Sequence, residues 1–250
     1  FFIDDEFRRY RHCYCQNCSD KLMISKNCFI LSYVKYGDYD AVLHCFCEEG
    51  GFQSFFAKGF YSSKSKKKGY IFPLNYIQIS ISKRNKTIPN ITNIELLNQY
   101  DFRNININTI LWFISDFLNQ ILRNETDDSK IYFEIERFLT ELYQLNFNSH
   151  LAFLYKLLSY LGISPLFGEG SFLNPETGTF STKQTHHLFD ANISVVWKNY
   201  LTKEDPYEIS LNRTNRILFL ETLMIYYSYH LPGFYQPNSL EIIRQIYDGN

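Results

Sequence analysis

The first half of the chain consists of short apolar-rich runs that turn residues separate. In the run at 75–83, Ile77, Ile79 and Ile81 alternate with polar or aromatic residues, so that one face is wholly apolar. A period of two in a run this short is typical of a half-buried strand. Together, the successive runs predict a small closed or partly open β-barrel, with strands at 28–36, 41–49, 52–60, 75–83 and 88–97.

From about residue 105 the apolar period becomes that of a helix. Apolar residues recur three and four positions apart at 110–122 and 131–142, and a third such stretch covers 149–162. A long apolar helix is expected from Asn212 or Arg213 as far as the break at Pro232-Gly233. Residues 165–182 are rich in Gly, Pro, Asn and Thr, which predicts a hairpin between helices.

This change of period predicts an α+β chain of more than one domain. We expect a barrel domain over 23–97 and an all-α domain, with the small hairpin inserted, over 98–250. The first Met is Met23, directly before the first strand, so we expect residues 1–22 to be an extraneous or disordered extension. No apolar run has the ~18–20 residues that cross a bilayer, and nothing resembles a secretory signal. These absences predict a cytoplasmic protein with reduced cysteines.

Charge is distributed unevenly between the two parts. Residues 23–90 hold ten basic and four acidic residues, a net charge of +6, whereas residues 91–250 hold eleven basic and eighteen acidic ones, a net charge of −7. A basic part joined to an acidic part suggests different partners for the two.

The basic residues concentrate in one predicted loop and at the end of the strand before it. Five lysines fall within eleven residues: Lys58, Lys64, Lys66, Lys67 and Lys68. Lysines grouped in this way can neutralise nucleic-acid phosphates, and the nearby Tyr61 and Tyr70 could stack on bases. Weaker candidates for phosphate contact are Lys35, Lys83 and Arg84. The alternatives are a merely solvated loop, and aromatic side chains that only pack the barrel core.

Metal binding and catalysis find little support in the sequence. Cys13, Cys15 and Cys18 lie close together, but structural zinc sites usually pair two ligand hairpins, and the only second pair would be Cys45 and Cys47 in a strand. Cys28, Cys45 and Cys47 are more simply explained as small buried hydrophobic residues. No nucleophile elbow, phosphate loop, dinucleotide fingerprint or zinc-protease motif occurs. We therefore expect no metal, no cofactor and no catalytic residue.

One long stretch resembles the start of the RecO family of bacterial DNA repair proteins. Its parts are the turn Tyr36-Gly37-Asp38-Tyr39-Asp40, the tripeptide Ala57-Lys58-Gly59, the basic stretch Lys64-Ser65-Lys66, then Gly69 and Pro73. Residues 229–247 and 160–182 are similar to RecO proteins of the Bacteroidetes type, so the resemblance covers about 24–248. Many RecO proteins carry a four-cysteine zinc site after residues equivalent to 161–165. Here residues 166–182 contain no cysteine, so the zinc site of those proteins is not expected in this chain.

The resemblance implies an N-terminal OB-fold, a helical C-terminal domain and a recombination mediator that is not an enzyme. Such proteins bind single- and double-stranded DNA, anneal complementary strands, and help load RecA on gaps with RecR and, in many bacteria, RecF. They also engage the C-terminal tail of the single-strand binding protein SSB. Two other functions stay open at this point: an adaptor that touches only proteins, and an OB-fold RNA-binding protein.

Overall fold

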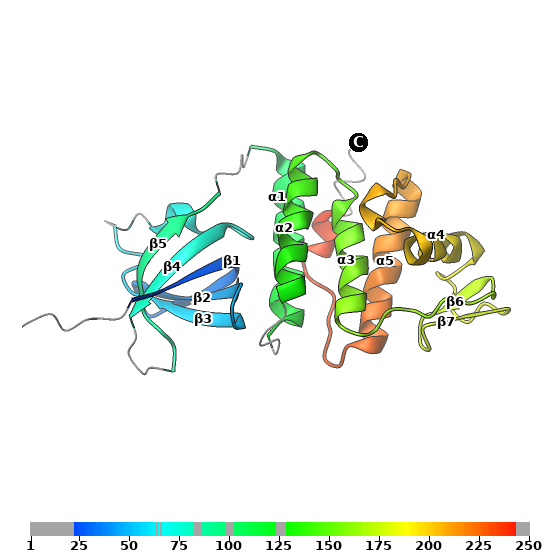
Figure 1. Ribbon diagram of the computed structural model, residues 1–250, viewed down its shortest axis with the longest axis horizontal. Coiled ribbons are helices and arrows are strands. Elements are labelled where there is room, and N and C mark those ends of the chain that lie inside the picture. The colour runs from blue at the N-terminus through cyan, green and yellow to red at the C-terminus, as the bar shows by residue number, and fades with distance from the viewer. Residues whose placement is uncertain are drawn as a thin grey trace, which may run out of the picture.

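The computed structural model describes residues 23–63, 65, 67–82, 87–98, 103–123 and 129–243. In Figure 1 a β-barrel occupies one end of an elongated molecule and a bundle of helices occupies the other. Helices α1 (Ile105–Ile121) and α2 (Ser129–Tyr143) stand between the barrel and the rest of the bundle. The α+β class predicted from the change of period is confirmed.

The barrel is one antiparallel sheet in the order β3-β2-β1-β4-β5. Its strands are β1 (Met23–Tyr36), β2 (Asp40–Cys47), β3 (Gly51–Ala57), β4 (Tyr76–Ser82) and β5 (Ile91–Leu96). The Phe56 amide donates to the Pro89 carbonyl at 2.8 Å, which joins the two outer strands and closes the barrel. Ile77, Ile79 and Ile81 all face the interior, as their alternation predicts.

Strand boundaries differ from the predicted ones for identifiable reasons. Strand β3 ends at Ala57 rather than at Phe60, because Gly59 has a φ of +65° and turns the chain. Strand β1 begins at Met23, five residues earlier than its apolar run, because it pairs with β4 through its polar first half. Backbone pairing of that kind leaves no mark on the apolar pattern.

The helical part contains the expected helices and one that the apolar pattern did not reveal. Its elements are α1, α2, α3 (Ser149–Tyr160), α4 (Ala191–Thr202), the 3-10 helix η2 (Pro206–Glu208) and α5 (Arg213–His230). Asn212 caps α5, so that the helix begins at Arg213, which is one of the two predicted starts. Helix α4 was missed, although Asp190 caps it and Trp197 and Tyr200 lie on its buried face. The hairpin expected within 165–182 is present as β6 (Phe172–Asn174) and β7 (Thr179–Ser181).

The barrel and the helices share a hydrophobic core. Phe29 of β1 lies 5.1 Å from Tyr76 of β4 and 4.9 Å from Tyr132 of α2, measured between ring centroids. Leu31 and Phe46 of the barrel belong to the same buried cluster as the helices. Within the described residues, no helix is both long and apolar enough to cross a membrane.

Candidate nucleic-acid interface

Two hydrogen bonds fix the end of the barrel from which the basic loop emerges. The Gly59 amide donates to the Asp40 carboxylate at 2.7 Å, and the Tyr61 amide donates to the Tyr39 carbonyl at 2.8 Å. The β1–β2 turn and the segment that follows β3 are therefore bound side by side. As a result, Lys58 and Tyr61 are held against the turn that contains Asp38.

Two of the candidate lysines converge on one aromatic ring at this end. The Lys35 ammonium lies 5.8 Å from the centroid of Tyr61, and the Lys68 ammonium lies 5.0 Å from it. Lys35 comes from the end of β1, and Lys68 lies in the 3-10 helix η1 (Lys67–Tyr70). Both lysines and Lys58 are exposed. Cations at this distance from a tyrosine ring are attracted by its π-electrons.

Several candidates lie outside the part of the chain that the structure describes. They are Lys64, Lys66, Lys83 and Arg84, and for Lys67 only the backbone, at the start of η1, is described. Their proposed contact with phosphates stays a prediction. Cys13, Cys15 and Cys18, for which we expect no metal, also lie outside the described residues.

The aromatic side chains beside the loop divide into buried and half-buried ones. Phe60 is buried, and its ring packs edge-on against Tyr61 at 4.9 Å. Tyr61 and Tyr70 are half-buried and pack against the barrel core. Each of these tyrosines therefore has a structural role, and base stacking by either one stays a prediction.

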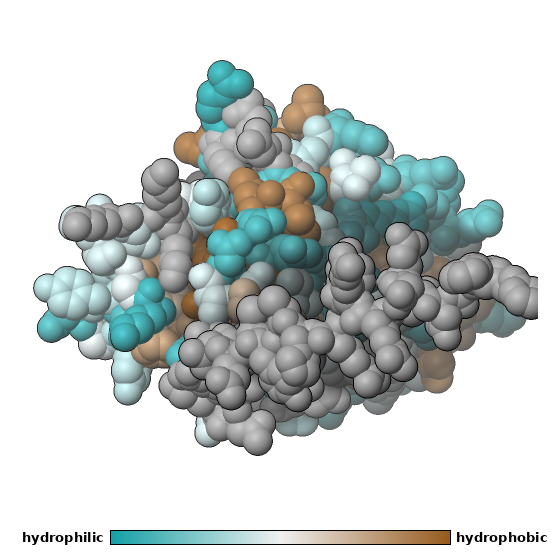
Figure 2. All heavy atoms as spheres, turned by 60° about the vertical axis from the view of Figure 1, so that its left-hand side comes forward, coloured by the Kyte–Doolittle hydropathy of each residue, from teal (hydrophilic) through white to brown (hydrophobic). Residues whose placement is uncertain are grey.

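Exposed aromatic residues at the end of β1 and on the β1–β2 turn were not among the sequence candidates. Tyr33, Tyr36 and Tyr39 are all exposed, and Tyr33 packs against Phe60 with 5.7 Å between ring centroids. With the barrel side brought forward, Figure 2 shows small apolar patches among hydrophilic residues. A basic surface with interleaved aromatic side chains is the composition that single-stranded nucleic acid binds.

Known proteins resemble this chain both in the barrel and along nearly its whole length. A family model described as "Recombination protein O N terminal" matches residues 22–100. The DNA repair protein RecO of Flavobacterium psychrophilum is 27% identical over 246 residues, covering 90% of this chain and 100% of the relative. That of Porphyromonas gingivalis is 28% identical over 250 residues, covering 91% of this chain and 100% of the relative.

The chain is similar to RecO proteins along about 90% of its length. The predicted resemblance is thereby confirmed, and with it the assignment to DNA repair and recombination. The structure also explains why the two parts of the N-terminal motif, residues 36–40 and 57–59, occur together. Asp40 closes the first part of the motif and Gly59 closes the second, and these two residues are hydrogen-bonded to each other.

A groove lies beside the shared core, between the barrel and the helical body. Its volume is about 550 Å³, and its walls come from β1, from the segment after η1, from α1 and from the C-terminal segment. Exposed Tyr33, Trp112 and Ile242 line it. The sequence alone could not reveal the groove, because its walls are up to 212 residues apart along the chain, from Ile30 to Ile242.

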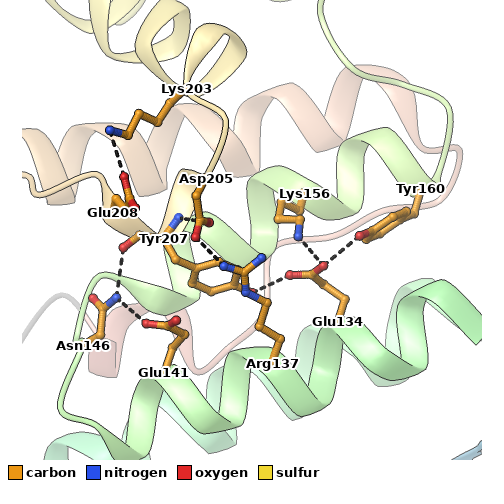
Figure 3. A network of polar contacts seen from close by, with 10 residues as sticks. All are labelled: Glu134, Arg137, Glu141, Asn146, Lys156, Tyr160, Lys203, Asp205, Tyr207 and Glu208. Carbon is orange, nitrogen blue, oxygen red and sulfur yellow. Dashed lines mark hydrogen bonds and ion pairs between the residues drawn. The ribbon is translucent and has the colours of Figure 1, made fainter.

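A buried polar network lies deeper in the helical body (Figure 3). Glu134 of α2 is 4% exposed, forms an ion pair with Lys156, and accepts hydrogen bonds from the hydroxyls of Tyr160 and Tyr207, each at 2.7 Å. Burial and the Glu134 carboxylate raise the pKa of Tyr207 far above its usual value. Every oxygen of Glu134 is thus engaged with protein, so the network ties α2, α3 and η2 together.

The three cysteines of the barrel have a structural role. Cys28, Cys45 and Cys47 are buried in the barrel core, as predicted, and burial raises the pKa of the Cys28 thiol well above its usual value. A thiol held protonated in this way is a poor nucleophile and a poor metal ligand. Among the described residues, no group of three His, Cys, Asp or Glu side chains could hold a metal ion.

Proposed function

We propose that this chain is a RecO-type recombination mediator that catalyses no covalent step. It binds single- and double-stranded DNA, anneals complementary strands, and helps load RecA on SSB-coated gaps together with RecR. The C-terminal tail of SSB is a further partner, and RecF is a candidate one. The similarity to RecO proteins supports this function, which is also what the sequence resemblance implies.

In the proposed mechanism the basic end of the barrel holds the phosphates of one or two strands. Lys64, Lys66, Lys67 and Lys68 do most of this, and Lys35, Lys58, Lys83 and Arg84 contribute. Two backbones neutralised on one surface repel each other less, so that complementary bases can pair. Because counterion release and base pairing supply the free energy, no cofactor is needed.

The observation that carries this proposal is the convergence of Lys35 and Lys68 on Tyr61. These lysines lie 33 residues apart in the sequence and on different elements, yet both ammonium groups lie within 6 Å of one ring centroid. If the loop were merely solvated, nothing would require Lys35 of β1 to lie beside it. The contacts therefore favour a cationic surface that extends beyond the loop.

The helical body has a different role in this proposal. We assign the barrel domain to 23–97 and the helical domain to 98–250, and we expect the acidic second domain to make the contacts with RecR and SSB. We also propose that the protein is cytoplasmic and associated with the nucleoid, where its DNA would be.

A salt titration tests the proposal. Fluorescent single-stranded DNA is titrated at several salt concentrations with the wild-type protein and with a variant in which Lys64, Lys66, Lys67 and Lys68 are changed to Glu. If all four contact phosphates, the log–log slope should fall by about three units, from roughly 0.7 per contact. Lys68→Glu and Lys183→Glu form a matched pair of single charge reversals, and only the first should lower the slope.

Two results would favour the other functions. An unchanged slope in the four-lysine variant would reject the loop as the DNA site and favour an adaptor that binds only proteins. Annealing of complementary RNA strands as fast as DNA strands would favour an RNA-binding protein.

A further inference from the structure

The groove between the barrel and the helices contains exposed aromatic surface. Trp112 of α1 is 51% exposed and Tyr33 of β1 is 41% exposed, and both line the groove. Phe72 packs edge-on against Trp112, with 5.9 Å between ring centroids, and so holds the indole in place. Aromatic side chains that are held in position but open on one side are platforms on which bases stack.

The polar groups of the groove bond mainly to one another. The Ser32 hydroxyl donates to the Asn119 side-chain oxygen at 2.8 Å, and the Ser239 hydroxyl donates to the Asp116 carboxylate at 3.1 Å. The Ser115 hydroxyl donates to the Leu31 carbonyl. What the groove offers a ligand is therefore mostly apolar and aromatic. Such a surface suits a ligand recognised by stacking rather than by a specific pattern of hydrogen bonds.

The groove continues directly into the basic surface. Phe72 follows Lys68 by four residues, so the two Cα atoms are at most roughly 14 Å apart. On the opposite wall, Tyr33 contacts Phe60, which contacts Tyr61, the ring on which Lys35 and Lys68 converge. A polyanion held by these lysines therefore passes the mouth of the groove. This charge complementarity favours a nucleic-acid strand over an apolar peptide as the occupant.

We infer that this groove receives an unstacked base of the single strand whose phosphates the barrel lysines hold. This inference rests on the proposed function and adds a second contact to it. Trp112 and Tyr33 stack on the base, and the basic end of the barrel binds the adjoining phosphates. Because stacking accepts every base, the site is tolerant of sequence. Paired bases in a duplex cannot enter, so the groove favours single strands.

The two tryptophans of the chain allow a direct test. Trp197 is fully buried against Phe219 and Tyr226, so a change in tryptophan emission on binding DNA reports on Trp112. The full chain is titrated with an oligothymidylate, and anisotropy of a label on the DNA is read beside tryptophan emission. The same titration uses a strand of equal length with abasic sites in place of all its bases.

We expect the oligothymidylate to quench Trp112 as anisotropy rises. The abasic strand should bind through its phosphates with little quenching. Trp112→Phe should remove the quenching while keeping most of the affinity, because it retains an aromatic face. Trp112→Ala should weaken binding of the single strand roughly tenfold and leave duplex binding unchanged.

Three results would overturn the inference in distinguishable ways. Full anisotropy change with unaltered Trp112 emission would show that DNA binds elsewhere and would leave the groove to a protein partner. Equal quenching by the abasic strand would show that no base enters. If anisotropy does not change with any strand, the proposed function fails, and the base site fails with it.

Discussion

The Lys68 ammonium lies 5.0 Å from the centroid of the Tyr61 ring. Because Lys35 approaches the same ring, Tyr61 positions two cations at once. Replacing Tyr61 by Leu should weaken DNA binding about fivefold, since each exposed cation–π contact contributes roughly 0.5–1 kcal/mol. Fluorescence anisotropy with both DNA forms measures this effect.

The two DNA forms distinguish positioning from stacking at Tyr61. If Tyr61 only positions lysines, single and double strands should lose affinity equally, and Tyr61→Phe should restore both. A loss confined to single strands would instead assign a base to Tyr61 itself.

The hydrogen bond between Asp40 and Gly59 permits a prediction with an unexpected sign. Removing an acidic residue near a DNA site normally strengthens binding. Asp40→Ala should weaken it, because the segment that holds Lys58 and Tyr61 loses its attachment to the β1–β2 turn. The lost charged hydrogen bond should also lower the free energy of unfolding by about 1–3 kcal/mol, as measured with denaturant.

Asp38→Ala is the matched control on the same turn. Asp38 is exposed, so its removal should leave unfolding unchanged and should not weaken DNA binding. Equal effects of the two substitutions would contradict the positioning role of Asp40.

The network around Glu134 predicts a large loss of stability from a small change. Glu134→Gln removes the charge that Lys156 and two tyrosine hydroxyls share, and should lower the free energy of unfolding by about 2–4 kcal/mol. Glu136→Gln, two positions along the same helix, should be neutral or stabilising, because burial and the charge of Glu48 raise the Glu136 pKa. Denaturant melts of the two variants make the comparison. A larger loss in Glu136→Gln would show that the network is not what stabilises these helices.

His150 predicts how stability depends on pH. Its side chain is fully buried, and burial, aided by the charge of Arg216, lowers its pKa from 6.5 to about 3. Between these values the unfolded chain binds a proton that the folded chain does not, so stability falls as pH decreases. From pH 6.5 to 5 the loss from this residue should be about 2 kcal/mol.

Comparison of one variant with the wild type isolates the contribution of His150. Unfolding of His150→Leu should lose this part of the pH dependence, whatever its stability at neutral pH. An unaltered slope in His150→Leu would mean that another group titrates.

The barrel and most helices could be predicted because their signals are local. Alternation in β4 and the apolar stripes of α1 and α2 follow from which side chains face the core, and that pattern is visible in a single stretch. Helix α4 was missed because its 12 residues carry a short stripe. Its cap Asp190 was the available signal.

The candidate site was predictable only in part, since its contacts join distant segments. The run of lysines marked the loop, but the approach of Lys35 to Tyr61 depends on the pairing of β1 with β2. Trp112 was not among the sequence candidates, although it lies off the apolar stripe of α1, which is the position of an exposed side chain. The sequence could not show that this exposed ring lines a groove, because the other walls come from distant segments.

The cluster of Phe29, Tyr76 and Tyr132 has a consequence for how the chain can be divided. An isolated barrel cut after residue 97 would present Phe29, Leu31 and Phe46 to water, since their packing partners belong to the helices. Such a fragment should self-associate, and the intact protein should unfold in one cooperative transition. A force or a partner that acts on the helices is thereby transmitted to the barrel through packed side chains.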